Sequence, residues 1–349
     1  MCVDGGVGRR CGLVIGAGAA LGGAWALGAL CALQEVGGFD AAQADVVVGT
    51  SAGSVLVALI ACGVSPDRMA DRLTGDRGDV EGTEPVNPLD AVDHVGLALV
   101  AGRRRLLLPG NLALAVRSLG RPDRHTLMTA AAALAPRGRG SLEPVRRLVA
   151  EHLPASGWPE SPRTWLTAMD FDSGRRVVFG RSDGPQVALP DAVMASCAAP
   201  GYFPPVPLAG RRYVDGGAVS VTNADVLVRE GLDEILVLAP MALEGADPRA
   251  GAAAHFEGRL RHYARARLDW EVRRLRAAGA QVRVLAPTGE DLTVIGSNVM
   301  DPRRRRAVFE TALRTTAARL DIAEDGIVQD GITQDGITQD GIAQDGVAS

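Results

Sequence analysis

A short serine segment flanked by glycines most constrains how this chain can fold. Residues 49–53 read Gly-Thr-Ser-Ala-Gly, after a run (44–48) that ends in three valines and before an Ala- and Leu-rich run (54–60). Such runs are typical of a buried strand and of a helix, so the pattern predicts a tight strand-to-helix turn at Ser51. The flanking glycines leave room for a substrate carbonyl, and the helix N-terminus favours an anion. The segment therefore indicates a nucleophilic serine in an α/β protein.

A second strand, glycine loop and helix lie directly before the serine unit. The strand is 13–15, the loop is 16–23, and the helix begins at about residue 24. Backbone N–H groups of such a loop form a concavity that holds an anion, and a serine nucleophile needs donors of this kind for its oxyanion. Loops that follow parallel strands open at the same sheet edge. The oxyanion hole is therefore expected here, facing the serine, at Gly16, Gly18 and Ala19.

Two other interpretations of this glycine-rich region are disfavoured. A dinucleotide site requires a third glycine where Leu21 stands, and an acidic residue at the end of the second strand, where the serine segment stands instead. The 24 uncharged residues from Cys11 to Gln34 are long enough for a membrane span, but they include six glycines. Glycine costs about 1 kcal/mol in a helix interior, so we expect a loop, and a soluble, cytoplasmic protein.

The composition excludes several other classes of protein. A net charge of −4 over 349 residues gives no global attraction to nucleic acid. The five cysteines are odd in number and scattered without CxxC spacing, which argues against a disulfide framework or a zinc site and fits a reducing compartment. We expect neither a metal nor a cofactor.

The chain divides into four parts. We expect an N-terminal arm (1–11), a catalytic domain (12–228), a strand and helix completion of the same fold (229–321) and a disordered acidic tail of pentapeptide repeats (322–349). Within the catalytic domain, residues 65–88 are polar and rich in turn residues, and about 88–153 form a helical insertion. Apolar runs rimmed by arginine in this insertion fit either a lipid surface or packing on the core.

The remaining elements follow from hydrophobic patterns and turn residues. We expect hairpin strands at 164–169 and 176–179, a helix from 190, an irregular proline-rich wall at 198–205, a helix capped by Thr222 or Asn223, strands at 235–238 and 281–285, an Arg-rich helix at 256–278 and a last helix at 302–320. The arginines of the 256–278 helix are expected on a solvated face, with an anionic membrane as the alternative partner.

A serine hydroxyl is a weak nucleophile unless a base accepts its proton. Asp215 is the candidate acid. In the chain order serine, acid, histidine, only His255 and His262 follow it, and both lie in or beside the Arg-rich helix rather than on a loop. Asp215 ends a strand-like segment and precedes Gly216 and Gly217, which let it reach into a cleft. A partly desolvated carboxylate close to the serine has a raised pKa and can act as the base directly. On spacing alone, a simple turn at this aspartate is an equal alternative.

Residues 12–228 resemble the patatin-like phospholipase family, in its bacterial branch. The resemblance rests on the motifs 16–22, 49–53 and 215–217, in the family's order, and on the segment 195–205. It implies a three-layer α/β/α fold with a mainly parallel central sheet and a helical insertion. It also implies lipid acyl hydrolysis through an acyl-enzyme, by a serine–aspartate dyad without histidine.

Carried to this sequence, the resemblance implies that Ser51 attacks the acyl ester and that Asp215 accepts its proton. Gly49 and Gly53 are then the glycines of the nucleophile turn, and the first glycine loop is the oxyanion hole. One residue departs from the family, because Leu21 stands where Arg or Lys is usual. Backbone donors do not depend on that side chain, but a charge that would favour anionic lipid is missing.

Two further functions stay open at this point. A carboxylesterase that depends on His255 or His262 is the alternative within enzymes. A lipid-binding or scaffold protein without catalysis, with Leu21 as a sign of lost activity, is the alternative outside them. The expected partners are a lipid or small ester substrate and, peripherally, a membrane surface, while the sequence leaves the oligomeric state undetermined.

Overall fold

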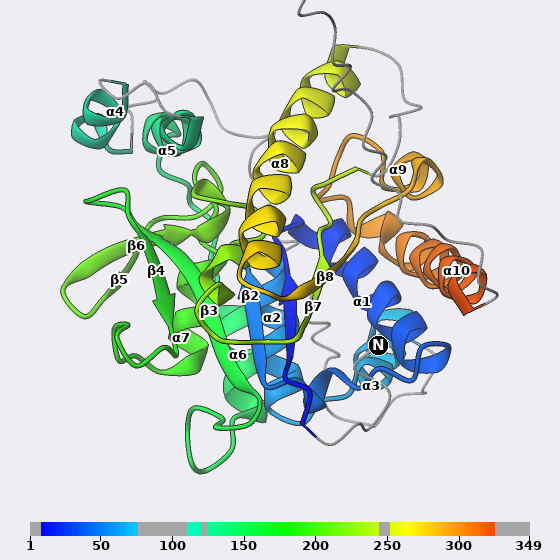
Figure 1. Cartoon of the computed structure of the whole chain (residues 1–349). Helices are drawn as coiled ribbons and strands as arrows, with labels where there is room; N and C mark the ends of the chain where they lie inside the picture. The colour runs from blue at the N-terminus through cyan, green and yellow to red at the C-terminus, as the bar shows by residue number, and fades with distance from the viewer. Residues whose placement is uncertain (1–7, 76–109, 120–123, 244–251, 325–349) are drawn as a thin grey trace, which may run out of the picture.

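The computed structural model describes residues 8–75, 110–119, 124–243 and 252–324, and an eight-stranded sheet lies at its centre (Figure 1). The strand order is β5-β6-β3-β2-β1-β7-β8, and β4 pairs with β3. The strands are β1 (Cys11–Ile15), β2 (Val46–Thr50), β3 (Arg163–Asp170), β4 (Arg176–Phe179), β5 (Val206–Leu208), β6 (Arg211–Asp215), β7 (Glu234–Leu238) and β8 (Gln281–Leu285). Neighbours among β1, β2, β3, β7 and β8 pair in parallel, whereas β4, β5 and β6 pair antiparallel. The predicted mainly parallel sheet is confirmed.

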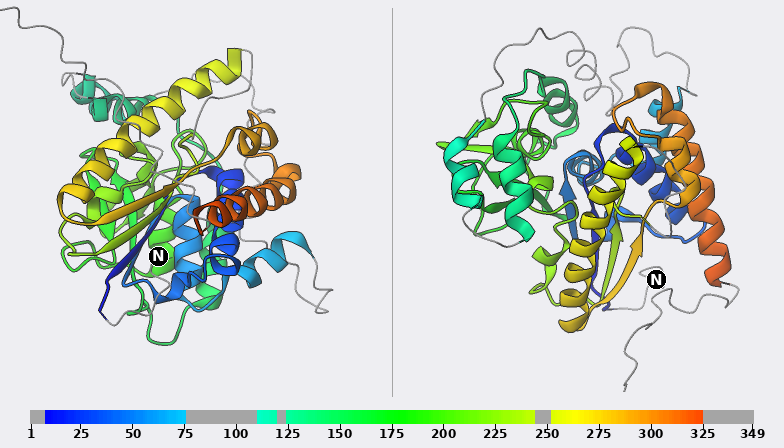
Figure 2. Two further views of the ribbon diagram at one scale, coloured as in Figure 1. Left: turned by 45° about the vertical axis from the view of Figure 1, so that its right-hand side comes forward. Right: turned by 90° about the horizontal axis from the view of Figure 1, so that it is seen from above.

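Helices cover both faces of the sheet and complete the three layers (Figure 2). Alternate side chains of a strand point to opposite faces, and Leu13 and Ile15 of β1 therefore lie in a different core from Val14. The core with Leu13 is packed by helices α1 (Ala19–Glu35), α2 (Ala52–Ala61), α6 (Glu143–His152), α7 (Leu189–Ser196) and α10 (Arg305–Glu324). On the other face, α8 (Ala252–Ala277) contributes Leu268, Val272 and Leu275 to the core with Val14.

Strand β3 is long, and two strands share one of its edges. Leu166 and Thr167 pair with both β2 and β4, while Ala168 pairs with both β4 and β6. Strand β4 therefore occupies one edge of β3, and β2 and β6 follow one another along the other edge. Because Thr50 pairs with Thr167 and Asp215 pairs with Ala168, the ends of β2 and β6 meet at consecutive residues of β3.

The structure corrects the predicted start of the first helix. Helix α1 begins at Ala19 rather than at about residue 24, so the glycines at 22 and 23 lie in the helix and not in the loop. Glycine is needed in this helix because neighbouring segments come very close. A Cβ on Gly28 would lie 2.5 Å from the carbonyl oxygen of Phe309 in α10.

Residues 66–74, within the polar segment 65–88 that is rich in turn residues, form a helix. Helix α3 (Pro66–Thr74) has Ser65 as its N-cap, a proline in its first turn and Gly75 in the left-handed conformation at its end. These are the ordinary start and stop signals of a helix, and the polar composition of the segment obscured them.

Two further differences concern short elements. The segment after Asn223 forms only a 3-10 helix, η4 (Ala224–Leu227), and a short helix, α9 (Gly289–Ile295), was not predicted. The hairpin of β3 and β4, the helix from residue 190 and the strands β7 and β8 are confirmed within one residue of most predicted bounds.

The described part of the helical insertion contains α4 (Leu112–Leu119), α5 (Arg124–Leu134) and α6. Residues 88–109, most of the predicted arm (1–7) and the repeats from residue 325 lie outside the described residues. Helix α10 extends to Glu324, into the segment assigned to the tail.

Two expectations from composition can be compared with the structure. In the described ranges, every helix is too short or too polar to cross a bilayer. Cys31, Cys62 and Cys197 carry free thiols, but Cys11 is disulfide-bonded, so this cysteine departs from the expected reduced state.

Candidate active site

Ser51 lies at the turn between β2 and α2, as predicted. Its backbone dihedrals are φ 55° and ψ −126°, and helix α2 begins at the next residue. A positive φ is strained for a residue other than glycine and persists only where the surroundings hold it. Here the Ser51 N–H donates to Ser196 Oγ at 3.0 Å, and the Ser51 carbonyl accepts from Ser54 Oγ at 2.6 Å. The main chain of Ser51 is therefore fixed, and its hydroxyl does not cap the helix.

Close packing requires glycine on both sides of Ser51. A Cβ on Gly53 would lie 2.1 Å from the carbonyl oxygen of Ile15, and a Cβ on Gly49 would lie 2.5 Å from Cα of Ser54. Protein interiors do not accommodate contacts this short without moving the backbone. Gly53 thus allows the first turn of α2 to lie against the end of β1, where the first glycine loop begins.

Asp215 is the last residue of β6, and it comes next to Ser51 through the shared edge of β3. Its N–H donates to the Ala198 carbonyl at 3.0 Å, and its carboxylate Oδ1 accepts from the Gly217 N–H at 2.7 Å. The Ser51 side chain lies close enough to the Asp215 carboxyl group to lower the pKa of that group. Two residues that are 164 positions apart in the sequence therefore meet in one site.

The environment of Asp215 favours its neutral form more than water does. The side chain is only 6% exposed, and this burial raises the pKa of Asp215 from 3.8 to about 6, although the nearby Ser51 side chain and the hydrogen bond from Gly217 lower it in part. Above this pH the group is a carboxylate that can accept a proton. A base with a pKa near neutrality combines the correct ionisation state with a useful driving force for proton transfer.

The first glycine loop lies beside this pair. A Cβ on Gly217 would lie 3.5 Å from Cβ of Ala17. The Gly16 N–H donates to the Leu238 carbonyl at 2.9 Å, which corrects the expectation that Gly16 is an oxyanion donor. Within the described part of the chain, the N–H groups of Gly18 and Ala19 have no acceptor, and Ala19 has a positive φ of 52°. The available donors of the loop are therefore those of Gly18 and Ala19.

Asn223 is a residue of the site that the sequence did not identify, beyond a possible helix cap. It is fully buried, its φ is 54°, and its Nδ2 donates to Thr50 Oγ1 at 3.2 Å and to Thr167 Oγ1 at 3.1 Å. The two threonine hydroxyls are 2.7 Å apart. Asn223 thus connects the loop after Asp215 to the strand ends that carry Ser51. A left-handed asparagine has no local sequence signature that separates it from an ordinary cap.

The described histidines are not placed as a base for Ser51. His262 is exposed on α8, on a helix face away from the core. His152 ends α6, and its ring contacts the Leu148 carbonyl at 2.8 Å and Arg72 at 3.3 Å. The side chain of His255 lies outside the described residues. The histidine-dependent alternative therefore has no support from His262.

The remaining predictions about the site concern Leu21 and metals. Leu21 is fully buried, and its N–H donates to the Val299 carbonyl at 3.0 Å, so this side chain packs in the core rather than facing a substrate. Among the residues that the structure describes, no group of three or more His, Cys, Asp or Glu side chains is arranged to hold a metal ion.

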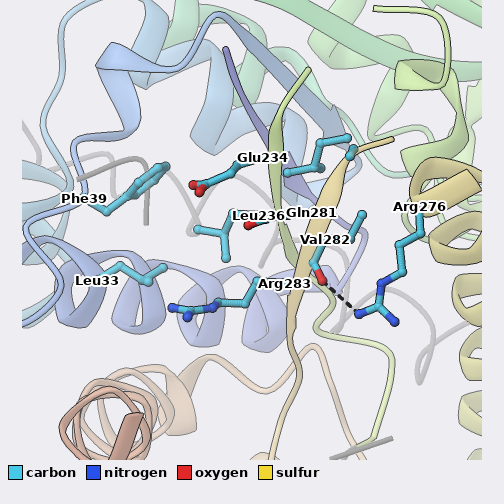
Figure 3. Close-up of a pocket in the computed structure, with 10 residues that line it drawn as sticks. Leu33, Phe39, Glu234, Leu236, Arg276, Gln281, Val282 and Arg283 are labelled. Carbon is cyan, nitrogen blue, oxygen red and sulfur yellow. Dashed lines mark hydrogen bonds between the residues drawn. The ribbon is translucent and has the colours of Figure 1, made fainter. Parts of the chain in front are cut away.

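A cavity of about 510 Å³ lies elsewhere, between helix α1 and the amino-terminal ends of β7 and β8 (Figure 3). Leu33, Phe39 and Leu236 give it an apolar lining. At its rim, Glu234 pairs with Arg9 at 2.9 Å, and Arg276 donates to the Val282 carbonyl at 3.0 Å. Because Ser51 follows the carboxyl end of β2, this cavity lies at the opposite edge of the sheet and takes no part in the chemistry of the site.

Comparisons with known proteins identify a matching family model and several similar solved structures. A family model described as patatin-like phospholipase matches residues 13–228. No curated protein matches the chain. Among solved structures, VipD from Legionella pneumophila is 16% identical with a TM-score of 0.43, and the match covers 90% of this chain and 67% of that one. The type III effector protein ExoU is 18% identical with a TM-score of 0.36, and the match covers 90% of this chain and 54% of that one. A heterodimeric complex, ExoU-SpcU from Pseudomonas aeruginosa, is 19% identical with a TM-score of 0.31, and the match covers 91% of this chain and 60% of that one.

Proposed function

Because this chain belongs to the patatin-like phospholipase family, we propose that it hydrolyses lipid acyl esters through an acyl-enzyme on Ser51, with Asp215 as the general base. The observation that carries this proposal is that the ends of β2 and β6 meet on β3, so that the Ser51 side chain lies beside the buried Asp215 carboxyl group and lowers its pKa. A serine hydroxyl needs such a partner to become a nucleophile.

In the acylation step, Ser51 Oγ attacks the ester carbonyl carbon while its proton passes to the Asp215 carboxylate. The electrons of the C=O double bond move to the carbonyl oxygen, which becomes an oxyanion. The N–H groups of Gly18 and Ala19 and the N-terminus of α2 stabilise this charge. The bond to the leaving alcohol then breaks, and the alcohol oxygen takes the proton from Asp215.

Deacylation repeats the same proton transfers with water. A water molecule attacks the acyl carbon of the ester on Ser51 and gives its proton to Asp215. The second tetrahedral intermediate collapses, the free acid leaves, and Ser51 recovers its proton from Asp215. The fixed, strained backbone of Ser51 keeps the nucleophile oriented through both steps, which lowers the entropic cost of each.

A lipid substrate also calls for a contact with the lipid surface, and we assign it to four exposed apolar side chains, called here the apolar rim: Leu112, Val116, Leu134 and Tyr202, which are 36–63% exposed. Backbone hydrogen bonds keep these segments adjacent, because Asn111 N–H donates to the Ala133 carbonyl at 2.9 Å and Gly140 N–H donates to the Tyr202 carbonyl at 3.0 Å.

Helices α4 and α5, which carry three residues of the apolar rim, pack close to the site. The buried faces of α4 and α5 pack on Met169, Phe171 and Val214, at the ends of the strands that carry the site. Exposed Arg137 and Arg139 follow α5 and supply positive charge for anionic lipid. Leu21, which stands where the family usually has Arg or Lys, supplies none. The protein therefore acts at a membrane surface as a peripheral enzyme.

The proposal is tested with a panel of short esters, lysophospholipids, phospholipids and acylglycerols. The wild type should hydrolyse members of this panel, and Ser51→Ala and Asp215→Asn should lose at least about 1,000-fold in kcat. A fluorophosphonate should label Ser51 in the wild type. An unlabelled serine, or a Ser51→Ala variant with full activity, contradicts the proposal and favours the lipid-binding alternative or another nucleophile.

A further inference from the structure

The loop that follows Asp215 is held by a carboxylate from helix α8. Ser220 Oγ donates to Glu271 Oε1 at 2.6 Å, and Thr222 Oγ1 donates to Glu271 Oε2 at 2.5 Å. The Ala224 N–H donates to the same Oε2 at 2.9 Å. Three contacts, from residues 220, 222 and 224, therefore fix the loop on the side of α8, and Glu271 itself is fully buried.

The charge of Glu271 is compensated within the same helix. Arg267 Nε lies 3.0 Å from Glu271 Oε1, and Arg267 also lies 3.5 Å from Asp225, which pairs with Arg176 at 2.5 Å. Burial and the nearby Asp225 raise the pKa of Glu271, while Arg267 and the two hydroxyls favour its charged form. A buried ion is tolerated only when it is paired and hydrogen-bonded in this way, so the site is built around the carboxylate.

Asn223 holds the same loop on the opposite side from Glu271, where the loop meets the ends of β2 and β3. Besides its bonds to the two threonines at the ends of β2 and β3, its Nδ2 donates to the Ser220 carbonyl at 2.5 Å and lies 3.4 Å from the Gly216 carbonyl. Gly216 is the residue after Asp215. The amide of Asn223 therefore links the backbone beside the carboxylate to the strand end beside the nucleophile.

We propose that Asn223 and Glu271 are positioning residues, which hold the loop 216–224 so that the Asp215 carboxylate faces Ser51. The inference rests on the proposed function and goes beyond it, because Glu271 lies outside residues 13–228, which match the family model. Helix α8 is then a part of the catalytic unit and not only a cover of the sheet.

The test uses Asn223→Ala and Glu271→Gln in the full chain. A misplacement of about 1 Å costs about 100-fold in rate, so we expect kcat to fall about 10- to 100-fold with KM within about twofold of wild type. Water reaching the loosened loop should also shift the pKa of Asp215 down, toward its ordinary value, by about one unit. The pKa is measured directly from the carbon NMR signal of the Asp215 carboxyl group, and independently from the acid limb of kcat against pH.

Thr315→Val is the matched control. Thr315 is a buried threonine whose Oγ1 donates to Asp291 Oδ1 at 3.0 Å, between α10 and α9. Its loss should lower Tm as the loss of one buried hydrogen bond does, with kcat and the pKa of Asp215 unchanged. Thr222→Val, which removes only one bond to Glu271, should lie between the control and Glu271→Gln, and it serves as a second test where the larger changes prevent folding.

A purely structural role predicts a different result. If Asn223→Ala and Glu271→Gln lower Tm but leave kcat and the pKa of Asp215 at wild-type values, or raise KM alone, the inference is overturned. Failure of the proposed function has another signature, because Ser51→Ala would then keep its activity whatever the NMR titration of Asp215 gives.

Discussion

At the scale of single residues, the carboxyl group of Asp215 sets the expected pH dependence of the rate. Its pKa of about 6 means that the base is protonated, and therefore inactive, in mildly acidic solution. We expect kcat/KM to rise tenfold per pH unit below about pH 6 and to be flat above about pH 7. Steady-state rates on a short, uncharged ester between pH 4 and 9 measure this profile. A midpoint near pH 4 would contradict it.

The same carboxyl group also affects stability. Because the pKa of Asp215 is higher in the folded protein than the ordinary value of 3.8, the stabilisation from its bound proton is complete below about pH 4 and is lost as the pH rises to about 6. The shift of about two units corresponds to about 3 kcal/mol. Asp215→Asn should therefore raise Tm above pH 6 and change it little below pH 4, as measured by thermal unfolding. Ser51→Ala, which keeps the carboxylate, should retain the decrease in Tm between these values.

At the scale of elements, the contact between helix α2 and the end of β1 depends on Gly53. Gly53→Ala places a Cβ 2.1 Å from the Ile15 carbonyl oxygen, and we expect a loss of about 2–3 kcal/mol in stability and at least about 100-fold in kcat. Chemical denaturation and ester turnover measure the two effects. Gly258→Ala in α8 is the control, because, apart from the backbone of its own helix, no heavy atom of the described residues lies within 4 Å of the new Cβ. It should gain up to about 1 kcal/mol and keep its activity.

The apolar rim makes a separate prediction about helix α4. Leu112 and Val116 are 61% and 63% exposed, so Leu112→Asp and Val116→Asp together should leave Tm and short-ester turnover within about twofold of wild type. Hydrolysis of phospholipid in vesicles should fall at least about tenfold, since burying a charge at a lipid surface is unfavourable. Ala318→Asp is the control, at an exposed position of α10, on the other side of the molecule (Figure 2). An equal loss of turnover on the short ester and on vesicle phospholipid would contradict this prediction. It would mean that other residues of this chain, and not lipid, cover this face.

The elements also show why some parts of the site follow from the sequence and others do not. Ser51 and Asp215 stand in local patterns, a strand followed by small residues, and such patterns report backbone geometry within a few positions. Glu271 is one charged residue in an Arg-rich helix, and only the packing of that helix on the sheet gives it a role. Likewise, the glycines of α1 serve close packing that local glycine content does not reveal, because a Cβ on Gly22 would lie 2.9 Å from Cβ of Pro240 and a Cβ on Gly28 would lie 2.5 Å from the carbonyl oxygen of Phe309.

At the scale of the whole molecule, the meeting of Ser51 and Asp215 depends on the completed sheet. Strand β2 comes from the first half of the chain and β6 from the second, and both must be paired to β3 in the correct register. Long-range pairings of this kind form late in folding. After dilution from urea, labelling of Ser51 by a fluorophosphonate should therefore lag behind the recovery of far-UV circular dichroism. Simultaneous recovery of the two signals would contradict this order.

The shared edge of β3 has a consequence for the living cell. A ribosome releases the nucleophile segment long before it has made residue 215, so an unfinished polypeptide carries the hydroxyl without its proton acceptor. On the proposed mechanism, such a polypeptide cannot digest the membranes of the cell that synthesises it.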